Sequence, residues 1–243
     1  MLRVVMFEPY PMGLGGNFLT QRFILERLNN DNNHLIVVAP MDGVALEQFR
    51  KMGIECEIIS PPGKLGHYGG AVLRAGFMGR LKSTFDVLRY NYQIARYLRS
   101  REIDIIYSNC VRAQLLVGFG ALFARVPSLL YIKGELANPF IDRLCLLLAS
   151  KILFFGPQNR DDLYPYLVRW LRSKIDILRI GLDPMQIKEV ECRDHSDLRK
   201  ELEIDSAHLN TIVLGQLYQP KGQHFVFRYV LLTVMCSRNL AVY

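Results

Sequence analysis

The sequence has little of what disulfide-bonded or metal-binding proteins need. Its five cysteines are odd in number, lie far apart and form no C-x-x-C pair, and its five histidines have no metal-ligand spacing to one another. We therefore expect reduced thiols in a cytoplasmic protein, with no bound metal and no other cofactor. The signatures G-x-x-x-x-G-K-[ST] and G-x-S-x-G are absent as well, which excludes a P-loop and a hydrolase nucleophile elbow.

Long hydrophobic runs are also missing. The apolar run after Arg3 ends at Glu8 and is too short for the core of a signal peptide. The longest apolar tracts, at 115–124 and 144–155, fall short of the ~18 to 20 residues that a spanning helix needs. We expect neither a secretory signal nor a membrane span. With 50% hydrophobic and 22% charged residues, the composition is typical of a globular chain of one or two domains.

The net charge of +7 is concentrated in one stretch. Between Lys64 and Arg101 there are eight basic residues and the single acid Asp86, so this stretch accounts formally for the whole excess. The remaining residues are balanced in charge. This distribution argues against a nucleic-acid binder and for one local basic surface that meets an acidic partner.

Apolar runs and helical periodicities alternate through most of the chain. We expect strands at 4–7, 34–39, 54–59, 103–107, 128–132, 152–155 and 175–178, and helices at about 17–28, 42–52, 82–101, 108–123, 139–149 and 157–171. The alternation predicts an α/β fold, a Rossmann-like parallel sheet with helices on both faces. We expect this first domain to span residues 1–182. Asn17 is the expected N-cap of the first helix, and Ser108 and Asn109 are expected to begin the fourth.

The helix expected at 82–101 is amphipathic and asymmetrically charged. Lys82, Arg89 and Arg96 fall on one face, opposite the apolar face that includes Ile94 and Leu98. One interpretation is a surface helix with solvated basic side chains. The other is a membrane patch that contacts anionic lipid headgroups, helped by aromatic residues near the interface, in a protein peripheral to the inner face of the membrane. The aromatic candidates are Phe77, Phe85 and Tyr92.

The turn after the first strand is rich in glycine. Gly13 and Gly15 could open a dinucleotide fingerprint, but Phe18 stands where G-x-G-x-x-G needs its third glycine. A dinucleotide site is therefore not expected there.

Polar residues follow the strand expected at 128–132. Lys133 and Glu135 lie at its carboxyl end, where open parallel sheets have their ligand crevice. We interpret them as candidate site residues, with an ordinary surface turn as the alternative.

The end of the chain has the outline of an anion-binding turn. A strand is expected at 211–214, Gly215 allows a turn, and Pro220 suits the first turn of a helix that would begin near Lys221. The alternative is an ordinary turn with a solvated lysine. Residues 183–210 are charged and weakly patterned, so we expect a connector with one short helix at 196–202. Residues 211–243 would then be the incomplete start of a second domain.

Three motifs together resemble the family 4 glycosyltransferases of the GT-B fold. They are Gly15 and Gly16 in the first turn, Gly181 and Asp183 in a Gly-x-Asp, and the segment from Leu214 to Gln223. The resemblance runs from Arg3 to about Phe227. It implies two Rossmann-like domains facing each other across a cleft, of which the second binds a nucleotide-sugar and the first receives the acceptor. Catalysis in that family is metal-independent.

The resemblance also implies roles for particular residues. Lys221 would neutralise the donor diphosphate, and Gln216 stands where many members have an arginine. Gly15 and Gly16 would let backbone amides approach the phosphate or the acceptor. The acceptor-side residues would be Asn17, Lys133 and Glu135, and the last two stand where the family often has a histidine.

The family's paired-glutamate motif has no counterpart in this sequence, so the catalytic residues are not identified. We expect a truncated chain with little or no transferase activity. The implied function is hexosyl transfer from a nucleotide-sugar donor to a lipid-linked or polysaccharide acceptor in cell-surface glycan biosynthesis. Two alternatives stay open: a non-catalytic binding or regulatory module derived from a glycosyltransferase, and another Rossmann-type enzyme such as a nicotinamide oxidoreductase.

Overall fold

The computed structural model describes residues 2–29, 33–63, 77–134, 136, 138–157, 165–181, 184–191, 223–226 and 228. The chain divides into two compact units, residues 1–181 and 182–243. Several predicted features lie outside the described residues. They are the connector helix at 196–202, the strand at 211–214, and the candidate residues Glu135, Asp183, Gln216 and Lys221.

The first unit is built on a seven-stranded sheet in the order β3-β2-β1-β4-β5-β6-β7. All six neighbouring pairs are parallel, as the alternation of strands and helices predicts. The strands are β1 (Arg3–Phe7), β2 (His34–Ala39), β3 (Glu55–Ile58), β4 (Ile105–Ser108), β5 (Ser128–Ile132), β6 (Lys151–Phe154) and β7 (Ile175–Ile177). The predicted Rossmann-like α/β sheet is therefore confirmed.

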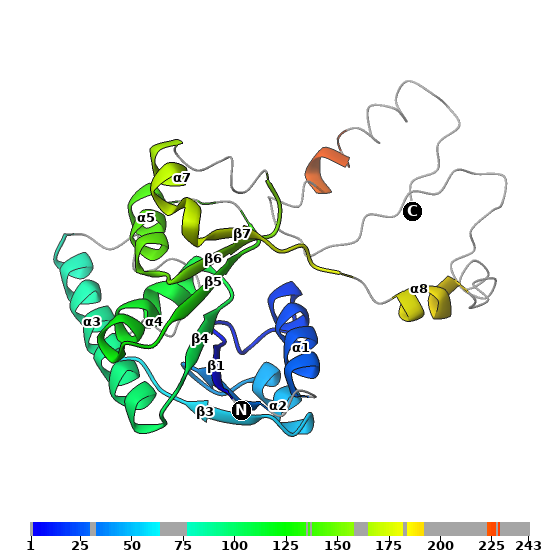
Figure 1. Ribbon diagram of the computed structural model, residues 1–243, viewed down its shortest axis with the longest axis horizontal. Helices are drawn as coiled ribbons and strands as arrows, with labels where there is room; N and C mark the ends of the chain where they lie inside the picture. The colour runs from blue at the N-terminus through cyan, green and yellow to red at the C-terminus, as the bar shows by residue number, and fades with distance from the viewer. Residues whose placement is uncertain are drawn as a thin grey trace. The chain divides into compact units, whose positions relative to one another are not determined.

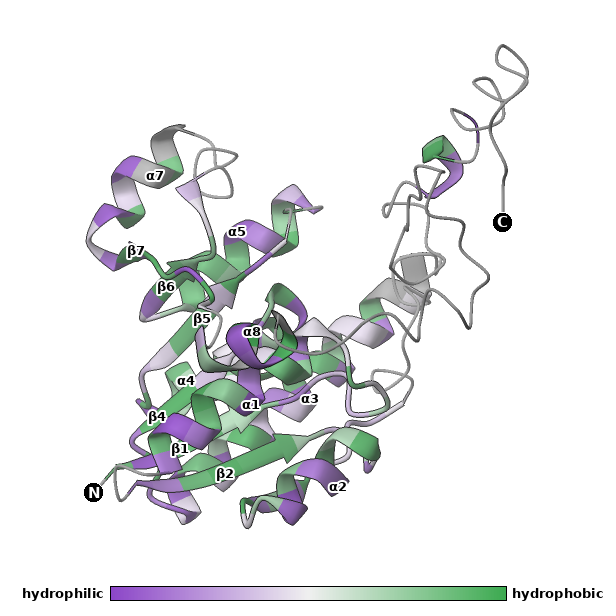
Figure 2. Ribbon diagram, turned by 90° about the vertical axis from the view of Figure 1, so that its right-hand side faces the viewer, coloured by the Kyte–Doolittle hydropathy of each residue, from purple (hydrophilic) through white to green (hydrophobic). Residues whose placement is uncertain are grey.

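Helices cover both faces of this sheet (Figure 1). Side chains alternate between the faces along each strand, so Val5 and Phe7 pack with one set of helices, and Val4 and Met6 with the other. The first set is α3 (Phe77–Ser100), α4 (Val111–Ala124) and α5 (Pro139–Leu148), and the second is α1 (Gly16–Asn29) and α2 (Val44–Lys51). In Figure 2, β2 is hydrophobic throughout its central part, whereas α2 carries hydrophilic residues.

The remaining described elements are short. In the first unit, α7 (Pro165–Leu171) leads through a 3-10 turn (Arg172–Lys174) into β7. In the second unit, α8 (Pro184–Glu191) lies in the part of the chain for which the sequence analysis predicted no helix. The charged sequence there has weak apolar periodicity, which is why it was assigned to a connector.

Several predicted helix starts differ from the structure: α1 begins one residue earlier than expected, α3 five residues earlier and α4 three residues later. Asn17 does not cap α1, because the helix already begins at Gly16 and the carbonyl of Gly15 accepts the first helical bond from the amide of Leu19 at 3.1 Å. The fourth helix begins at Val111 with Cys110 as N-cap, not at Ser108 or Asn109. Ser108 pairs in β4 instead, which shifts the helix start toward the C-terminus.

Close packing between α3 and α4 fixes the position of α3. The buried amide of Asn91 on α3 donates to the carbonyl of Leu115 at 3.1 Å and accepts from the backbone N–H of Gly120 at 2.8 Å. A Cβ at position 120 would lie 2.7 Å from the Asn91 carbonyl oxygen and 2.9 Å from Cγ2 of Ile94. Glycine is therefore required for the two helices to approach this closely.

We expect Gly120→Ala to destabilise the fold by about 1 to 3 kcal/mol, because the added methyl group must displace backbone of the neighbouring helix. Alanine in an unhindered helix position would have the opposite effect, a gain of about 0.5 to 1 kcal/mol. Urea unfolding followed by circular dichroism measures the difference. Gly13→Ala is the control, since no atom lies within 4 Å of its added Cβ. Equal or higher stability of Gly120→Ala would contradict the packing described above.

Candidate functional site

The centre of the sheet has the topology of a ligand-binding edge. From β1 the chain builds outward through β2 and β3 on one side, and β4 then pairs with the other side of β1 and begins the series β4 to β7. In open parallel sheets, ligands bind outside the carboxyl ends of the strands where the order reverses in this way. Glu8 follows β1, Asn109 and Cys110 follow β4, and Lys133 follows β5. These four residues are here called the edge cluster.

Glu8 is a buried carboxyl group in the edge cluster. Only 1% of the residue is exposed. Its backbone N–H continues the ladder to the carbonyl of Val38 at 2.9 Å, and its Oε1 accepts from the backbone N–H of Tyr10 at 2.7 Å. Its Oε2 is buried without a hydrogen-bond partner among the described residues. Burial raises the pKa of Glu8 to about 7, although the Tyr10 amide and the nearby Lys133 act in the opposite direction.

Lys133 supplies the positive group of the edge cluster. Its Nζ lies 5.6 Å from the centre of the Tyr131 ring and is buried without a hydrogen-bond partner in the described part of the chain. Burial lowers the pKa of Lys133 to about 8, while Cys110 and Glu8 nearby favour its charged form. Glu8 and Lys133 therefore both titrate near neutral pH, which is the range in which a group can give or accept a proton during a reaction.

Several more polar atoms at this edge are buried and unpaired. Both amide atoms of Asn109 lack a partner among the described residues, as do the hydroxyls of Tyr107 and Ser108. Asn109 and Ser108 are fully buried. An unpaired buried polar group costs about 1 to 3 kcal/mol, so such groups are few in native proteins and gather where a ligand or water completes them. Half of the atoms of this kind among the described residues lie at the carboxyl ends of β1, β4 and β5.

The free thiol of Cys110 lies beside these groups at the start of α4. Burial raises its pKa to about 11, so it is a protonated thiol at neutral pH and a poor nucleophile. The edge cluster thus offers a carboxyl group, an amide and an amine that can form hydrogen bonds with hydroxyl or phosphate groups. It offers no activated cysteine.

The glycine-rich turn after Glu8 is open above the two glycines of interest. No atom lies within 4 Å of a Cβ built on Gly15 or Gly16, and both residues are exposed. Gly43 is different, because its added Cβ would lie 2.4 Å from the carbonyl oxygen of Pro11. Packing therefore requires glycine at position 43, whereas at 15 and 16 the structure leaves room for a ligand to approach the backbone.

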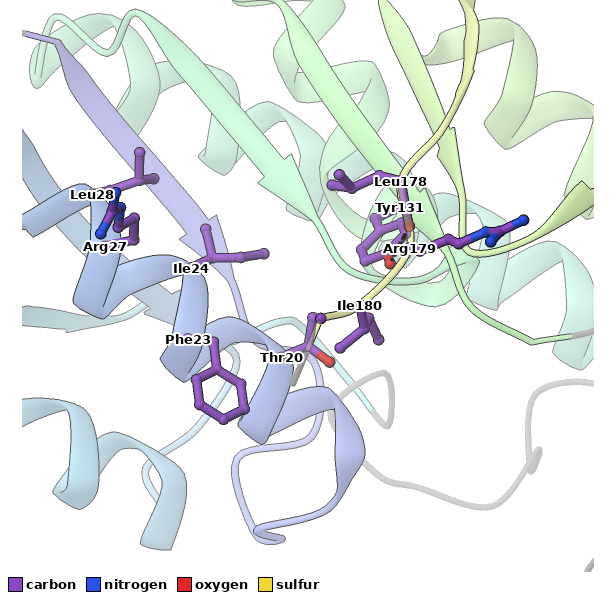
Figure 3. A pocket seen from close by; sticks show the side chains of 10 residues that line it. Thr20, Phe23, Ile24, Arg27, Leu28, Tyr131, Leu178, Arg179 and Ile180 are labelled. Carbon is purple, nitrogen blue, oxygen red and sulfur yellow. Dashed lines mark hydrogen bonds between the residues drawn. The ribbon is translucent and has the colours of Figure 1, made fainter. Parts of the chain in front are cut away.

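An apolar pocket of about 320 Å³ lies next to the edge cluster. Figure 3 shows side chains of α1, among them Phe23 and Ile24, across from Tyr131 and the segment that follows β7. The hydroxyl of Tyr131 donates to the carbonyl of Leu178 at 2.7 Å, and its ring also faces Lys133. Tyr131 thus lines the pocket and contacts Lys133 of the edge cluster. Most of the lining is apolar, and Arg27 and Arg179 are its charged members.

No group of three or more His, Cys, Asp or Glu residues that could hold a metal ion occurs among the residues that the structure describes. The polar atoms of the edge cluster mix a carboxyl group with an ammonium group, and a cationic side chain among the ligands disfavours a metal ion.

The sequence analysis singled out Lys133, Gly15 and Gly16, and the structure places them at the same edge of the sheet. Their roles stay predictions. Asn17 is partly buried in the first turn of α1. Glu8, Asn109 and Cys110 were missed as site residues. An acid placed directly after a buried apolar strand was the signal for Glu8.

Solved structures with a similar fold include glycosyltransferases. HepE (Alr3699) from Anabaena in complex with UDP and glucose is 17% identical with a TM-score of 0.61, over 95% of this chain and 58% of its own. In complex with UDP-glucose, HepE has a TM-score of 0.64. A glycosyltransferase from Rickettsia africae ESF-5 is 12% identical with a TM-score of 0.56, over 96% of this chain and 57% of its own. The sequence matches no protein-family model and no curated protein.

At these identities the comparison shows the fold alone, which is the Rossmann-like α/β fold of GT-B glycosyltransferases. The lipopolysaccharide outer core galactosyltransferase WaaB agrees, with a TM-score of 0.54 at 12% identity over 75% of this chain and 46% of its own. The chain spans 57 to 58% of the length of HepE.

We expect the ionisation of Glu8 to make the free energy of unfolding depend on pH. Its pKa rises from 4.5 in the unfolded chain to about 7 in the fold, so the folded state keeps a proton that the unfolded state has released. Stability therefore falls as pH rises between these values, by about 3 kcal/mol in all. Glu8→Gln lacks this loss. It should match the wild type near about pH 4.5 and exceed it by a similar amount near about pH 8.

Urea unfolding across this pH range measures the difference between the two proteins. Glu47→Gln is the matched control, because Glu47 is exposed on α2. A wild type whose stability relative to Glu8→Gln stays constant with pH would show that Glu8 is not buried as described.

Proposed function

We propose that this chain is a glycosyltransferase component that uses a nucleotide-sugar donor and a lipid-linked or polysaccharide acceptor, in cell-surface glycan biosynthesis. The observation that carries the proposal is the edge cluster, a set of buried unpaired polar groups at the switch point of a glycosyltransferase-like fold. The similar HepE structures bind UDP and UDP-glucose, which supports a UDP-sugar as the donor. The chain spans 58% of the length of HepE, so its activity, donor and acceptor are all part of the proposal.

In this proposal the first unit receives the acceptor. Glu8 and Asn109 bind the acceptor hydroxyl, and the pKa of Glu8 near 7 suits a group that takes up its proton. Lys133 and Glu135 belong to the same acceptor side. The backbone at Gly15 and Gly16, which is open to approach, would contact the phosphate or the acceptor.

The donor side is assigned to the residues after 210. A departing nucleoside diphosphate gains negative charge as its bond to the sugar breaks, so a fixed ammonium group stabilises the transition state more than the ground state. Lys221 is proposed to supply that charge, and Gln216 a neutral hydrogen bond to the phosphate. The proposed domains are 1–182 on the acceptor side, 183–210 as connector and 211–243 as the start of the donor domain. The mechanism proposed for the donor side requires no metal.

We expect the chain to bind UDP-glucose and not NADH, as judged by saturation-transfer difference NMR with each ligand separately. Lys221→Ala should weaken UDP-glucose binding about 10- to 100-fold, because a charge-assisted hydrogen bond contributes about 1.5 to 3 kcal/mol. Lys188→Ala on α8, an exposed lysine, is the control and should bind as the wild type does. NADH binding without UDP-glucose binding would instead favour a nicotinamide oxidoreductase.

We also expect the 243 residues alone to transfer little or no sugar, because the paired-glutamate motif of the resembling family is absent from the sequence. The assay follows radiolabelled glucose from UDP-glucose into a membrane lipid fraction. Donor binding with transfer at the rate of a complete glycosyltransferase would contradict this expectation and leave the donor assignment intact.

A further inference from the structure

The outer face of α3 carries an exposed apolar stripe. Leu81, Phe85, Leu88 and Tyr92 are spaced by four, three and four residues, which places them along one side of a helix. Their exposed fractions are 58%, 68%, 44% and 62%. The inner face of the same helix is buried through Tyr90, Ile94 and Leu98. α3 thus has a second apolar side that packs against none of the core clusters.

A basic stripe runs beside the apolar one. Lys82, Arg89 and Arg96 are seven residues apart, which is about two helical turns, and all three are exposed. None of them makes an ion pair with a described residue. The single acid of the helix, Asp86, points to the loop after β3, where its Oδ2 would lie 2.7 Å from a Cβ on Gly63. The stripe is therefore uncompensated positive charge.

The two stripes meet at a hollow of about 430 Å³ on the C-terminal half of α3. Arg89 and Arg96 flank it, Tyr92 lies between them in the sequence, and Gln93 also lines it. The Oε1 of Gln93 is buried without a partner in the described chain. Two unpaired guanidinium groups two turns apart provide planar, multiple hydrogen-bond donors, which is the arrangement that binds phosphoryl groups best.

Two more apolar side chains are exposed at the end of α4. A guanidinium N–H of Arg99 donates to the carbonyl of Phe123, so the end of α4 lies beside the last turns of α3. Leu122 and Phe123 are 57% and 49% exposed there. Figure 1 shows α3 as the outermost helix on this side of the sheet, with α4 next to it.

An anionic bilayer is the partner that matches both stripes at once. A helix that lies in the bilayer interface has an apolar face in the acyl chains and basic residues at the headgroups. A spanning role does not fit, since no helix among the described residues is long and apolar enough to cross a membrane. A second copy of α3 does not fit either, because it would bring two uncompensated basic stripes together.

We propose that the outer face of α3 docks on an anionic phospholipid bilayer, with Leu81, Phe85 and Tyr92 among the acyl chains and a headgroup phosphate held between Arg89 and Arg96. The role of this surface rests on the proposed function, because docking would bring the acceptor side to a lipid-linked acceptor. Each basic residue near an anionic surface contributes about fivefold to binding. Reversing three charges at once should therefore lower the partition coefficient by more than about 100-fold.

The test is co-sedimentation of the full chain with vesicles of phosphatidylglycerol and phosphatidylcholine, against vesicles of phosphatidylcholine alone. The wild type should pellet with the anionic vesicles and stay in solution with the neutral ones. The triple variant Lys82→Glu, Arg89→Glu, Arg96→Glu should stay in solution with both. Phe85→Ser, which keeps the charges, should lower binding to the anionic vesicles about tenfold through loss of buried aromatic surface.

A matched control separates this surface from net charge. Lys51, Arg169 and Arg172 are exposed on other elements, and their reversal to Glu changes the net charge equally but should leave vesicle binding unchanged. Equal loss in the control triple, or a wild type that ignores anionic vesicles, overturns the proposal. Circular dichroism confirms that each variant is folded. UDP-glucose binding is measured without vesicles and should be unchanged in all variants, so failure of the donor assignment and failure of this surface are told apart.

Discussion

The pairing of β1 with β4 joins segments about 100 residues apart, and both the sheet and the edge cluster depend on it. Its register runs from Val4 opposite Ile105 to Phe7 opposite Ser108. At the amino ends of the two strands, Asp104 fixes the register through two hydrogen bonds to Arg3. Its Oδ2 accepts from the amide of Arg3 at 2.7 Å, and its own amide donates to the Arg3 carbonyl at 3.0 Å. Because the register is fixed at one end, the residues that follow at the other end, Glu8 and Asn109, are held next to each other.

The polar groups at the carboxyl ends of the central strands make the fold less stable than it could be. A carboxyl group, an amine and an amide are buried there with atoms that no described residue completes. Apolar residues of the same volume would cost nothing of this kind, and buried ionic groups are often replaced by them without loss of stability. The sheet nevertheless places these residues at the ends of its three central strands. Natural proteins carry such destabilising groups mainly where function requires them, which is the physical reason to locate the site at this edge.

The sequence determines the sheet more clearly than it determines the site. The strand at His34–Ala39 has the predicted bounds, because a run of five buried apolar residues can be read without knowing its neighbours. Helix starts were less certain, since Gly16 and Val111 begin helices with no side-chain cap of the expected kind. Lys133 could be found because it directly follows a predicted strand. The sequence could not predict that Glu8 and Asn109 lie next to each other, because their proximity depends on the β1–β4 register and not on either segment alone.

The direction of α3 connects the proposed docking surface with the edge cluster. In a parallel sheet, a crossover helix starts near the carboxyl end of one strand and runs back to the amino end of the next. The hydroxyl of Tyr90, near the middle of α3, donates to the carbonyl of Ile59 just beyond β3 at 2.7 Å. The first turns of this 24-residue helix therefore extend past the carboxyl end of β3. Leu81 and Phe85 lie in that extension, so this part of the proposed docking surface is at the same edge of the sheet as Glu8 and Lys133. A bilayer bound there would face the edge where an acceptor hydroxyl is proposed to react, which is the arrangement that a lipid-linked acceptor needs.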